Sequence, residues 1–316
     1  MGRFVEGDAP QADAAAAAAI AGIGREICGL RVPRLSGVVL GGGYGRGEGG
    51  VAVGPDGAQR LSNDLDFFAV SEEGASDADL VAIGDALEPV SKRWSAALGI
   101  DVDFTVRTPW RIRHDAERVM IQELLHGYAD VAGAKGETLF SGIERRDPPV
   151  FPWTEAARLL MNRGVGLMLA KESDDPAFAA RNVNKCVLGA GDALLIVRCG
   201  YRWRTRERAA ALGDAMYSAA AEWKFRPKAE PVCGWDEARE KWLDAFDEVA
   251  AAGRAAGETR RSLYQALRWI ARRRRLGPLR SFGQDCTARV LWGVAESVRG
   301  GTPLPKPLMD DWRVFN

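Results

Sequence analysis

Two aspartates, Asp64 and Asp66, are separated by one residue in the stretch SNDLDFFAV, which has the alternation and apolar content of a strand. Alternate residues of a strand face the same side, so the two carboxylates lie about 6.5–7 Å apart along the backbone. Two exposed negative charges held this close repel one another unless a cation bridges them. The pair therefore predicts a binding site for a divalent metal ion.

A second pair of acids, Asp101 and Asp103, alternates with apolar residues in the stretch GIDVDFTVR. If this stretch is a strand beside residues 64–68, a third carboxylate converges on the first two. Because the two acids are two residues apart on the strand, both would lie on one face. We favour Asp103 as the third carboxylate because apolar residues flank it, whereas Asp101 sits just past Gly99. Three carboxylates suit two Mg²⁺ or Mn²⁺ ions, about 3.5–4 Å apart, that align oxygens for phosphoryl transfer.

The stretch LGGGYGRGEGG, residues 40–50, contains seven glycines. By letters it includes the dinucleotide fingerprint Gly45-x-Gly47-x-x-Gly50, but that fingerprint must open a helix, and VAVGPDGAQRLSN follows instead. A Walker loop is excluded because no Gly-Lys-Ser/Thr follows. Glycines also let backbone N–H groups approach and bind a triphosphate, and this is the function we expect here.

Together these features resemble the DNA polymerase β-type nucleotidyltransferase superfamily. Gly42-Gly43 resembles its glycine turn, and Asp64-Leu65-Asp66-Phe67 resembles its metal-binding strand. Residues 44–48, Tyr-Gly-Arg-Gly-Glu, resemble the Arg-Gly-Glu of many bacterial members. The resemblance covers residues 37–106. It departs from the family in spacing, because 20 residues separate the turn from Asp64, which an inserted hairpin turning at Pro55-Asp56-Gly57 would explain.

The resemblance implies transfer of a nucleoside monophosphate from an NTP to a hydroxyl group, with release of pyrophosphate and two Mg²⁺ ions as cofactors. The implied catalytic residues and metal ligands are Asp64, Asp66 and Asp103. The implied contacts to the triphosphate are Gly42, Gly43 and Arg46, with pairing between Arg46 and Glu48 as the alternative. A non-catalytic NTP-binding regulator on the same fold is the alternative function.

Hydrophobic periodicity predicts an α+β fold in two domains. Strands are expected at residues 37–40, 50–54, 65–70 and 100–106, with helices at 13–30, capped by Asp13, and at 77–98. The resemblance implies that these elements form a nucleotidyltransferase core over residues 1–150, with a mixed sheet flanked by helices. Prolines 148, 149 and 152 mark the boundary, and residues 151–316 are expected to form a helical bundle that closes the nucleotide cleft.

The helical half offers two candidate binding segments. Lys185, Gly189 and Asp192 recur at helical spacing after a start at Asp175-Pro176, and Lys185 is the candidate contact to the nucleotide. Arginine-rich stretches at 201–208 and 271–277 could bind RNA or the acceptor, or could simply be solvated helix ends.

Composition limits the remaining possibilities. The chain has 43 basic and 43 acidic residues, which disfavours a long RNA footprint, and its two histidines and five scattered cysteines exclude most histidine- or thiolate-based sites. No signal peptide or membrane span is expected, so we predict a cytoplasmic protein without membrane partners. Among acceptors, a small molecule is preferred over an RNA 3′ end or a protein hydroxyl.

Overall fold

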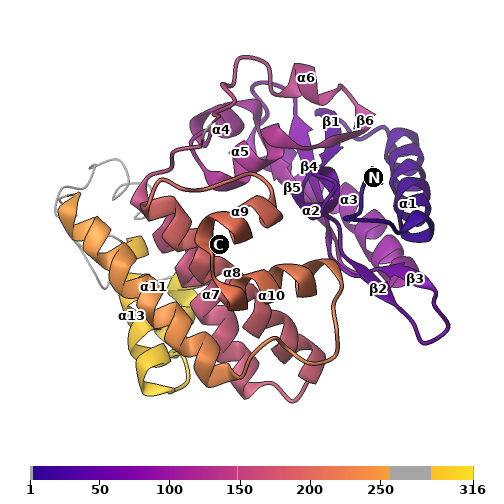
Figure 1. The fold of residues 1–316 in the computed structure, drawn as a ribbon. Coiled ribbons are helices and arrows are strands. Elements are labelled where there is room, and N and C mark those ends of the chain that lie inside the picture. The colour runs from indigo at the N-terminus through magenta and orange to yellow at the C-terminus, as the bar shows by residue number, and fades with distance from the viewer. Residues whose placement is uncertain (1–2, 148, 257–285, 316) are drawn as a thin grey trace. The chain divides into compact units, whose positions relative to one another are not determined.

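The computed structural model describes residues 3–147, 149–256 and 286–315 (Figure 1). The chain divides into two compact units. Unit 1 is Met1–Asp147 together with Lys224–Pro227, and unit 2 is Pro148–Trp223 together with Lys228–Asn316. Strands and helices mix in the first unit, whereas the second is built from helices, so the chain has an α+β fold.

Unit 1 is organised around a mixed four-stranded sheet in the order β5-β4-β1-β6. Its strands are β1 (Leu35–Leu40), β4 (Leu65–Ser71), β5 (Val102–Arg107) and β6 (Ala129–Gly133). Strand β1 is antiparallel to β4 and β6, whereas β4 and β5 are parallel. A parallel pair needs a long crossover, and helix α3 (Asp77–Leu98) provides it.

Each face of the sheet packs on its own hydrophobic cluster, because alternate strand residues point to opposite sides. Leu65 and Phe67 face helices α1 (Pro10–Leu30) and α3, whose buried residues include Ile23 and Leu87. Phe68 faces the other way. Its cluster includes side chains from three short helices, α4 (Pro109–His114), α5 (Val119–His126) and α6 (Gly136–Leu139). The predicted helices and core strands are therefore present, while β6 and the three short helices were not predicted.

The expected cap of the first helix is wrong. Helix α1 begins at Pro10, three residues before Asp13, and its N-cap is Ala9. The Asp13 carboxylate instead accepts hydrogen bonds from the backbone N–H groups of Arg3, Phe4 and Val5. These bonds, with the charge of Arg3, lower the pKa of Asp13 although burial opposes the change. Asp13 thus anchors the segment before the helix.

Two local elements separate β1 from β4. The glycine-rich stretch forms α2 (Gly42–Gly45), a single turn. Strands β2 (Val51–Val53) and β3 (Gln59–Leu61) then pair antiparallel. The amide of Gly54 donates to the carbonyl of Ala58, which closes the hairpin around residues 55–57. The hairpin that the sequence predicts is confirmed.

Unit 2 contains the helices of the second half of the chain. They are α7 (Trp153–Glu172), α8 (Pro176–Val197), α9 (Thr205–Leu212), α10 (Ala215–Phe225, whose last two residues belong to unit 1), α11 (Trp235–Ala255), α13 (Cys286–Gly300) and α14 (Lys306–Phe315). Asp175 caps α8 as expected, accepting hydrogen bonds from the amides of Ala177 and Phe178. The buried indole of Trp242 donates to the carbonyl of Leu160, which ties α11 to α7.

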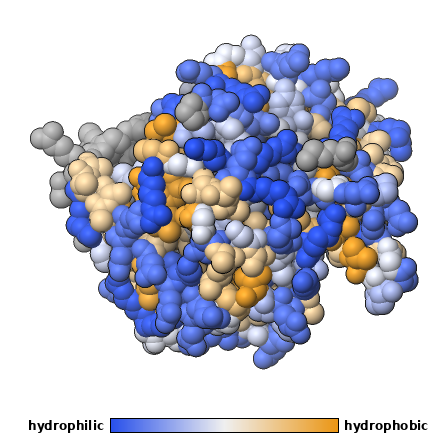
Figure 2. Space-filling model, in the orientation of Figure 1, coloured by the Kyte–Doolittle hydropathy of each residue, from blue (hydrophilic) through white to orange (hydrophobic). Residues whose placement is uncertain are grey.

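Hydrophilic residues cover much of the face drawn in Figure 2, with apolar residues in separate groups between them. Across the described ranges, none of the helices combines the length and the apolar character that crossing a membrane requires.

Candidate functional site

The parallel pairing of β4 and β5 brings the predicted acids together on one face of the sheet. In the register of the two strands, Asp66 lies directly opposite Asp103, as Leu65 lies opposite Val102. Residues opposite one another on neighbouring strands share a face and lie about 4.8 Å apart. Both aspartates are exposed, and their apolar neighbours Leu65 and Val102 are fully buried.

The two remaining acids lie at the start of the same strands. Asp64 immediately precedes β4, and the carbonyl of Asp101 accepts a hydrogen bond of 2.9 Å from the amide of Leu65. Partial burial raises the pKa of Asp103, and the negative charges of Asp101 and Asp64 raise it further. Asp103 therefore lies within electrostatic range of both, whereas the repulsion between Asp64 and Asp66 stays a prediction.

These oxygens are the ligands that Mg²⁺ and Mn²⁺ prefer. Nevertheless, within the described ranges no three His, Cys, Asp or Glu side chains are arranged so that they could hold a metal ion together. The strand register fixes the backbone positions of Asp66 and Asp103, whereas exposed side chains change rotamer within nanoseconds. The donor type and the repulsion at Asp103 fit a divalent cation.

The raised pKa of Asp103 predicts a stability effect. A carboxyl group whose pKa is higher in the folded than in the unfolded protein destabilises the fold when it is ionised. This cost is absent when the pH is below the pKa of the unfolded protein, and it is largest when the pH is above the pKa of the folded protein. Asp103→Asn should therefore stabilise the protein at about pH 7, by roughly 0.2–1 kcal/mol because the group is exposed, with the gain shrinking towards about pH 4. Urea unfolding at both pH values measures this.

Asp85→Asn, at an exposed acid on α3, is the control for the loss of one negative charge. Mg²⁺ should then stabilise the wild type more than the Asp103→Asn variant. Equal stability of wild type and variant across this pH range would contradict the clustering of charges.

The glycine turn lies against Asp66. The amide of Gly41 donates a 2.8 Å hydrogen bond to the carbonyl of Asp66. Gly42 has a φ of +60°, and a Cβ atom at this position would lie 2.1 Å from Asp66 Oδ2. Only glycine combines this backbone conformation with this approach. The structure thus brings two of the predicted site elements, turn and acid, into direct contact.

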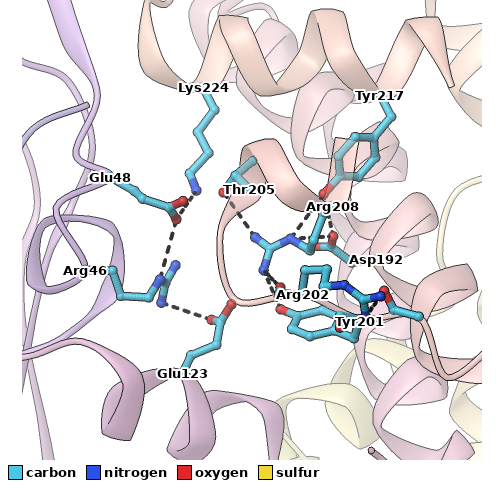
Figure 3. Close-up of polar contacts among 11 residues, drawn as sticks. Arg46, Glu48, Glu123, Asp192, Tyr201, Arg202, Thr205, Arg208, Tyr217 and Lys224 are labelled. Atoms are coloured by element: carbon cyan, nitrogen blue, oxygen red, sulfur yellow. Dashed lines mark hydrogen bonds and ion pairs between the residues drawn. The ribbon is translucent and has the colours of Figure 1, made fainter. Parts of the chain in front are cut away.

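Arg46, at the end of the turn, lies between two carboxylates (Figure 3). Its Nη1 is 3.1 Å from Glu123 Oε2, and its Nε is 3.6 Å from Glu48 Oε2. Lys224 Nζ lies 3.7 Å from the same oxygen of Glu48. The pairing of Arg46 with Glu48, which the sequence left as the alternative to phosphate binding, is therefore present. Glu123 and Lys224 were missed, since neither belongs to a motif.

Tyr44 is a further residue that sequence reasoning missed. It is fully buried; its hydroxyl donates to the carbonyl of Gly50 at 2.7 Å and accepts from the amide of Ser62 at 3.1 Å. Burial raises the pKa of Tyr44 to about 12, so it stays a hydrogen-bond donor at neutral pH. The tyrosine links the glycine turn to the residues just before Asp64, and an aromatic inside a glycine-rich stretch is the signal that could have found it.

The helical candidates take part in packing within unit 2. A Cβ atom on Gly189 would lie 2.3 Å from Arg163 Cγ of α7. The Asp192 carboxylate accepts from the hydroxyl of Tyr217 and lies 3.0 Å from Arg208 Nε. Lys185 is half-buried on the same helix, and its contact to a nucleotide stays a prediction.

Much of the arginine-rich stretch 201–208 is engaged inside unit 2 (Figure 3). Arg208 is 4% exposed, and its guanidinium donates to the hydroxyls of Tyr201 and Tyr217. Arg206 pairs with Glu222 on α10. The prediction of acceptor binding therefore applies to the exposed Arg202 and Arg204. The second stretch, 271–277, lies outside the described residues.

Comparison with known proteins does not assign this chain to a family. None of the protein-family models matches this chain, and no curated protein has a sequence that matches it.

Proposed function

We propose that this protein is a Mg²⁺-dependent nucleotidyltransferase of the DNA polymerase β type. It transfers a nucleoside monophosphate from an NTP to a hydroxyl acceptor and releases pyrophosphate. One observation carries the proposal: Asp66 lies opposite Asp103 in the parallel register, with the glycine turn against the Asp66 carboxylate. An acid pair on adjacent strands beside a glycine turn suits a substrate that brings both metal ions and phosphates.

Each site residue has a proposed role that follows from its position. Asp64 and Asp66 would hold both metal ions, and Asp103 would hold the ion on the side of the attacking hydroxyl and help to remove its proton. When bound there, such ions would supply positive charge to neutralise the phosphates and lower the pKa of the hydroxyl. The backbone N–H groups of Gly42 and Gly43 would bind the triphosphate. Because Arg46 already contacts two carboxylates, its proposed role is to support the turn.

The finer assignments belong to the same proposal. The helical unit would close over the nucleotide, with Lys185 as a phosphate contact. A small-molecule acceptor is preferred, because a chain with zero net charge provides little electrostatic attraction for a long RNA.

The test uses each of the four NTPs, labelled at the α-phosphate, with Mg²⁺ and size-fractionated cell extract. The proposal expects label in a low-molecular-weight acceptor fraction and release of pyrophosphate. Label confined to RNA, and lost in Arg202→Ala/Arg204→Ala, would reject the small acceptor. Calorimetric binding of an NTP without pyrophosphate release, across all fractions, would instead identify a non-catalytic NTP-binding regulator.

A paired comparison decides the third acid. Asp103→Asn should stop turnover while Asp101→Asn retains most of it, since Asp103 is the residue opposite Asp66. Loss of activity in Asp101→Asn alone would transfer the role to Asp101.

A further inference from the structure

Glu48 is the most deeply buried member of a cluster of four charged side chains in unit 1 (Figure 3). Its side chain is 2% exposed, against 10% for Arg46, 18% for Lys224 and 19% for Glu123. Removing a carboxylate from water is unfavourable unless cations and hydrogen bonds compensate for the loss. The two cations, from positions 178 residues apart in the sequence, provide that compensation at a single oxygen of Glu48.

The backbone of Glu48 closes the glycine turn. Its amide donates a 2.8 Å hydrogen bond to the carbonyl of Gly43, and the amides of Gly45 and Arg46 donate to the carbonyls of Gly41 and Gly42. The turn is thus a hydrogen-bonded unit, with Asp66 at one end through Gly42 and Glu48 at the other. Five of the seven residues from 41 to 47 are glycines, so only Tyr44 and Arg46 provide side-chain contacts within it.

Arg46 extends these contacts to α5. It reaches Glu123 with its guanidinium, and it packs so closely on Gly127 that a Cβ atom there would lie 2.6 Å from Arg46 Cγ. The carbonyl of Lys224 lies equally close to Gly50, 2.5 Å from where a Cβ atom would stand. The side chain of Arg46 and the backbone of Lys224 are therefore held by close packing.

We propose that Glu48 is the positioning residue of the glycine turn: its buried carboxylate, acting through Arg46 and Lys224, holds the turn against Asp66. The role of the turn in binding phosphate rests on the proposed function. The stabilisation of the turn by Glu48 does not depend on that function. Glu48 touches no reacting atom. Its effect on a nucleotide would come from the placement of the backbone N–H groups of Gly42 and Gly43.

The experiment separates positioning from simple charge balance. The cluster has two cations and two carboxylates, so Glu48→Gln leaves one buried cation in excess. The double variant Glu48→Gln/Lys224→Met restores the balance with Arg46 and Glu123. Glu72→Gln is the matched control, because it removes a carboxylate of unit 1 from an exposed ion pair with Arg34. Each full-length protein is studied by denaturant unfolding and by amide hydrogen exchange.

We expect the amides of Gly45, Arg46 and Glu48 to exchange at least tenfold faster in Glu48→Gln, while amides of β4 and β5 and the Glu72→Gln control keep wild-type rates. The double variant should recover wild-type stability without recovering the slow exchange of the turn. If Glu48→Gln does not fold, the double variant carries the test. Wild-type exchange of the turn in either variant would overturn the proposal.

A kinetic readout links the turn to substrate. In the double variant the KM for the NTP should rise about tenfold with kcat changed less than threefold, because ground-state and transition-state contacts to the phosphates are lost together. A fall in kcat at unchanged KM would overturn this role. If the wild type neither binds nor turns over any NTP, the proposed function fails, and hydrogen exchange still decides whether Glu48 holds the turn.

Discussion

Replacing Asp64 with asparagine should reduce pyrophosphate release by about a thousandfold or more, since removing one member of a charge-stabilising catalytic group commonly costs this much. Asparagine has nearly the shape of aspartate but not its charge, so a metal ion loses a ligand while the strand stays intact. Asp64 lies just before β4, and its charge helps to raise the pKa of Asp103, so its removal should also relieve repulsion. The measurement is pyrophosphate release at saturating NTP and Mg²⁺.

The control for Asp64→Asn is Asp56→Asn. Asp56 lies at the tip of the β2–β3 hairpin, where its carboxylate accepts from the amide of Ala58, and asparagine keeps an acceptor oxygen there. We expect wild-type turnover from this control and an undiminished unfolding temperature from Asp64→Asn. Turnover by Asp64→Asn at the wild-type rate would exclude the metal-binding role and with it the proposed mechanism.

The second large effect is expected at Gly42. An alanine there would adopt a φ of +60°, which costs about 1–2 kcal/mol for a residue with a Cβ atom. Its Cβ would also lie 2.1 Å from Asp66 Oδ2, so the turn or the carboxylate must move. A displacement of about 1 Å in an active site can cost a hundredfold in rate. Gly42→Ala should therefore lower kcat/KM at least about a hundredfold. It should also reduce the free energy of unfolding by more than the cost of the positive φ angle alone.

Gly74 provides the matched control for backbone strain. It has a φ of +75°, close to that of Gly42, but a Cβ atom there would meet nothing within 4 Å. Gly74→Ala should therefore lower the free energy of unfolding through backbone strain, without any loss of activity. If the two variants have equal activity, the contact between Gly42 and Asp66 has no catalytic consequence.

The local pattern of the sequence predicts much of unit 1 correctly. Alternation of buried and exposed residues is a property of each strand by itself, so Leu65, Asp66 and Phe67 identify β4 and its faces without knowledge of its neighbours. The same holds for α3, for the hairpin after the glycine turn and for the cap at Asp175. Asp13 shows the limit of the method: the same residue type that caps helices binds the amides of residues 3–5 instead.

Which residues meet across the chain was decided by tertiary structure. The sequence identifies four acids on two strands, but only the crossover through α3 and the resulting register place Asp66 opposite Asp103. Nothing in the sequence near Arg46 predicts Glu123 or Lys224, because a buried ion pair depends on which side chains packing brings within a few ångströms. Local periodicity records the surroundings of each residue in its own element, whereas partners far along the chain are selected by the folding of the whole unit.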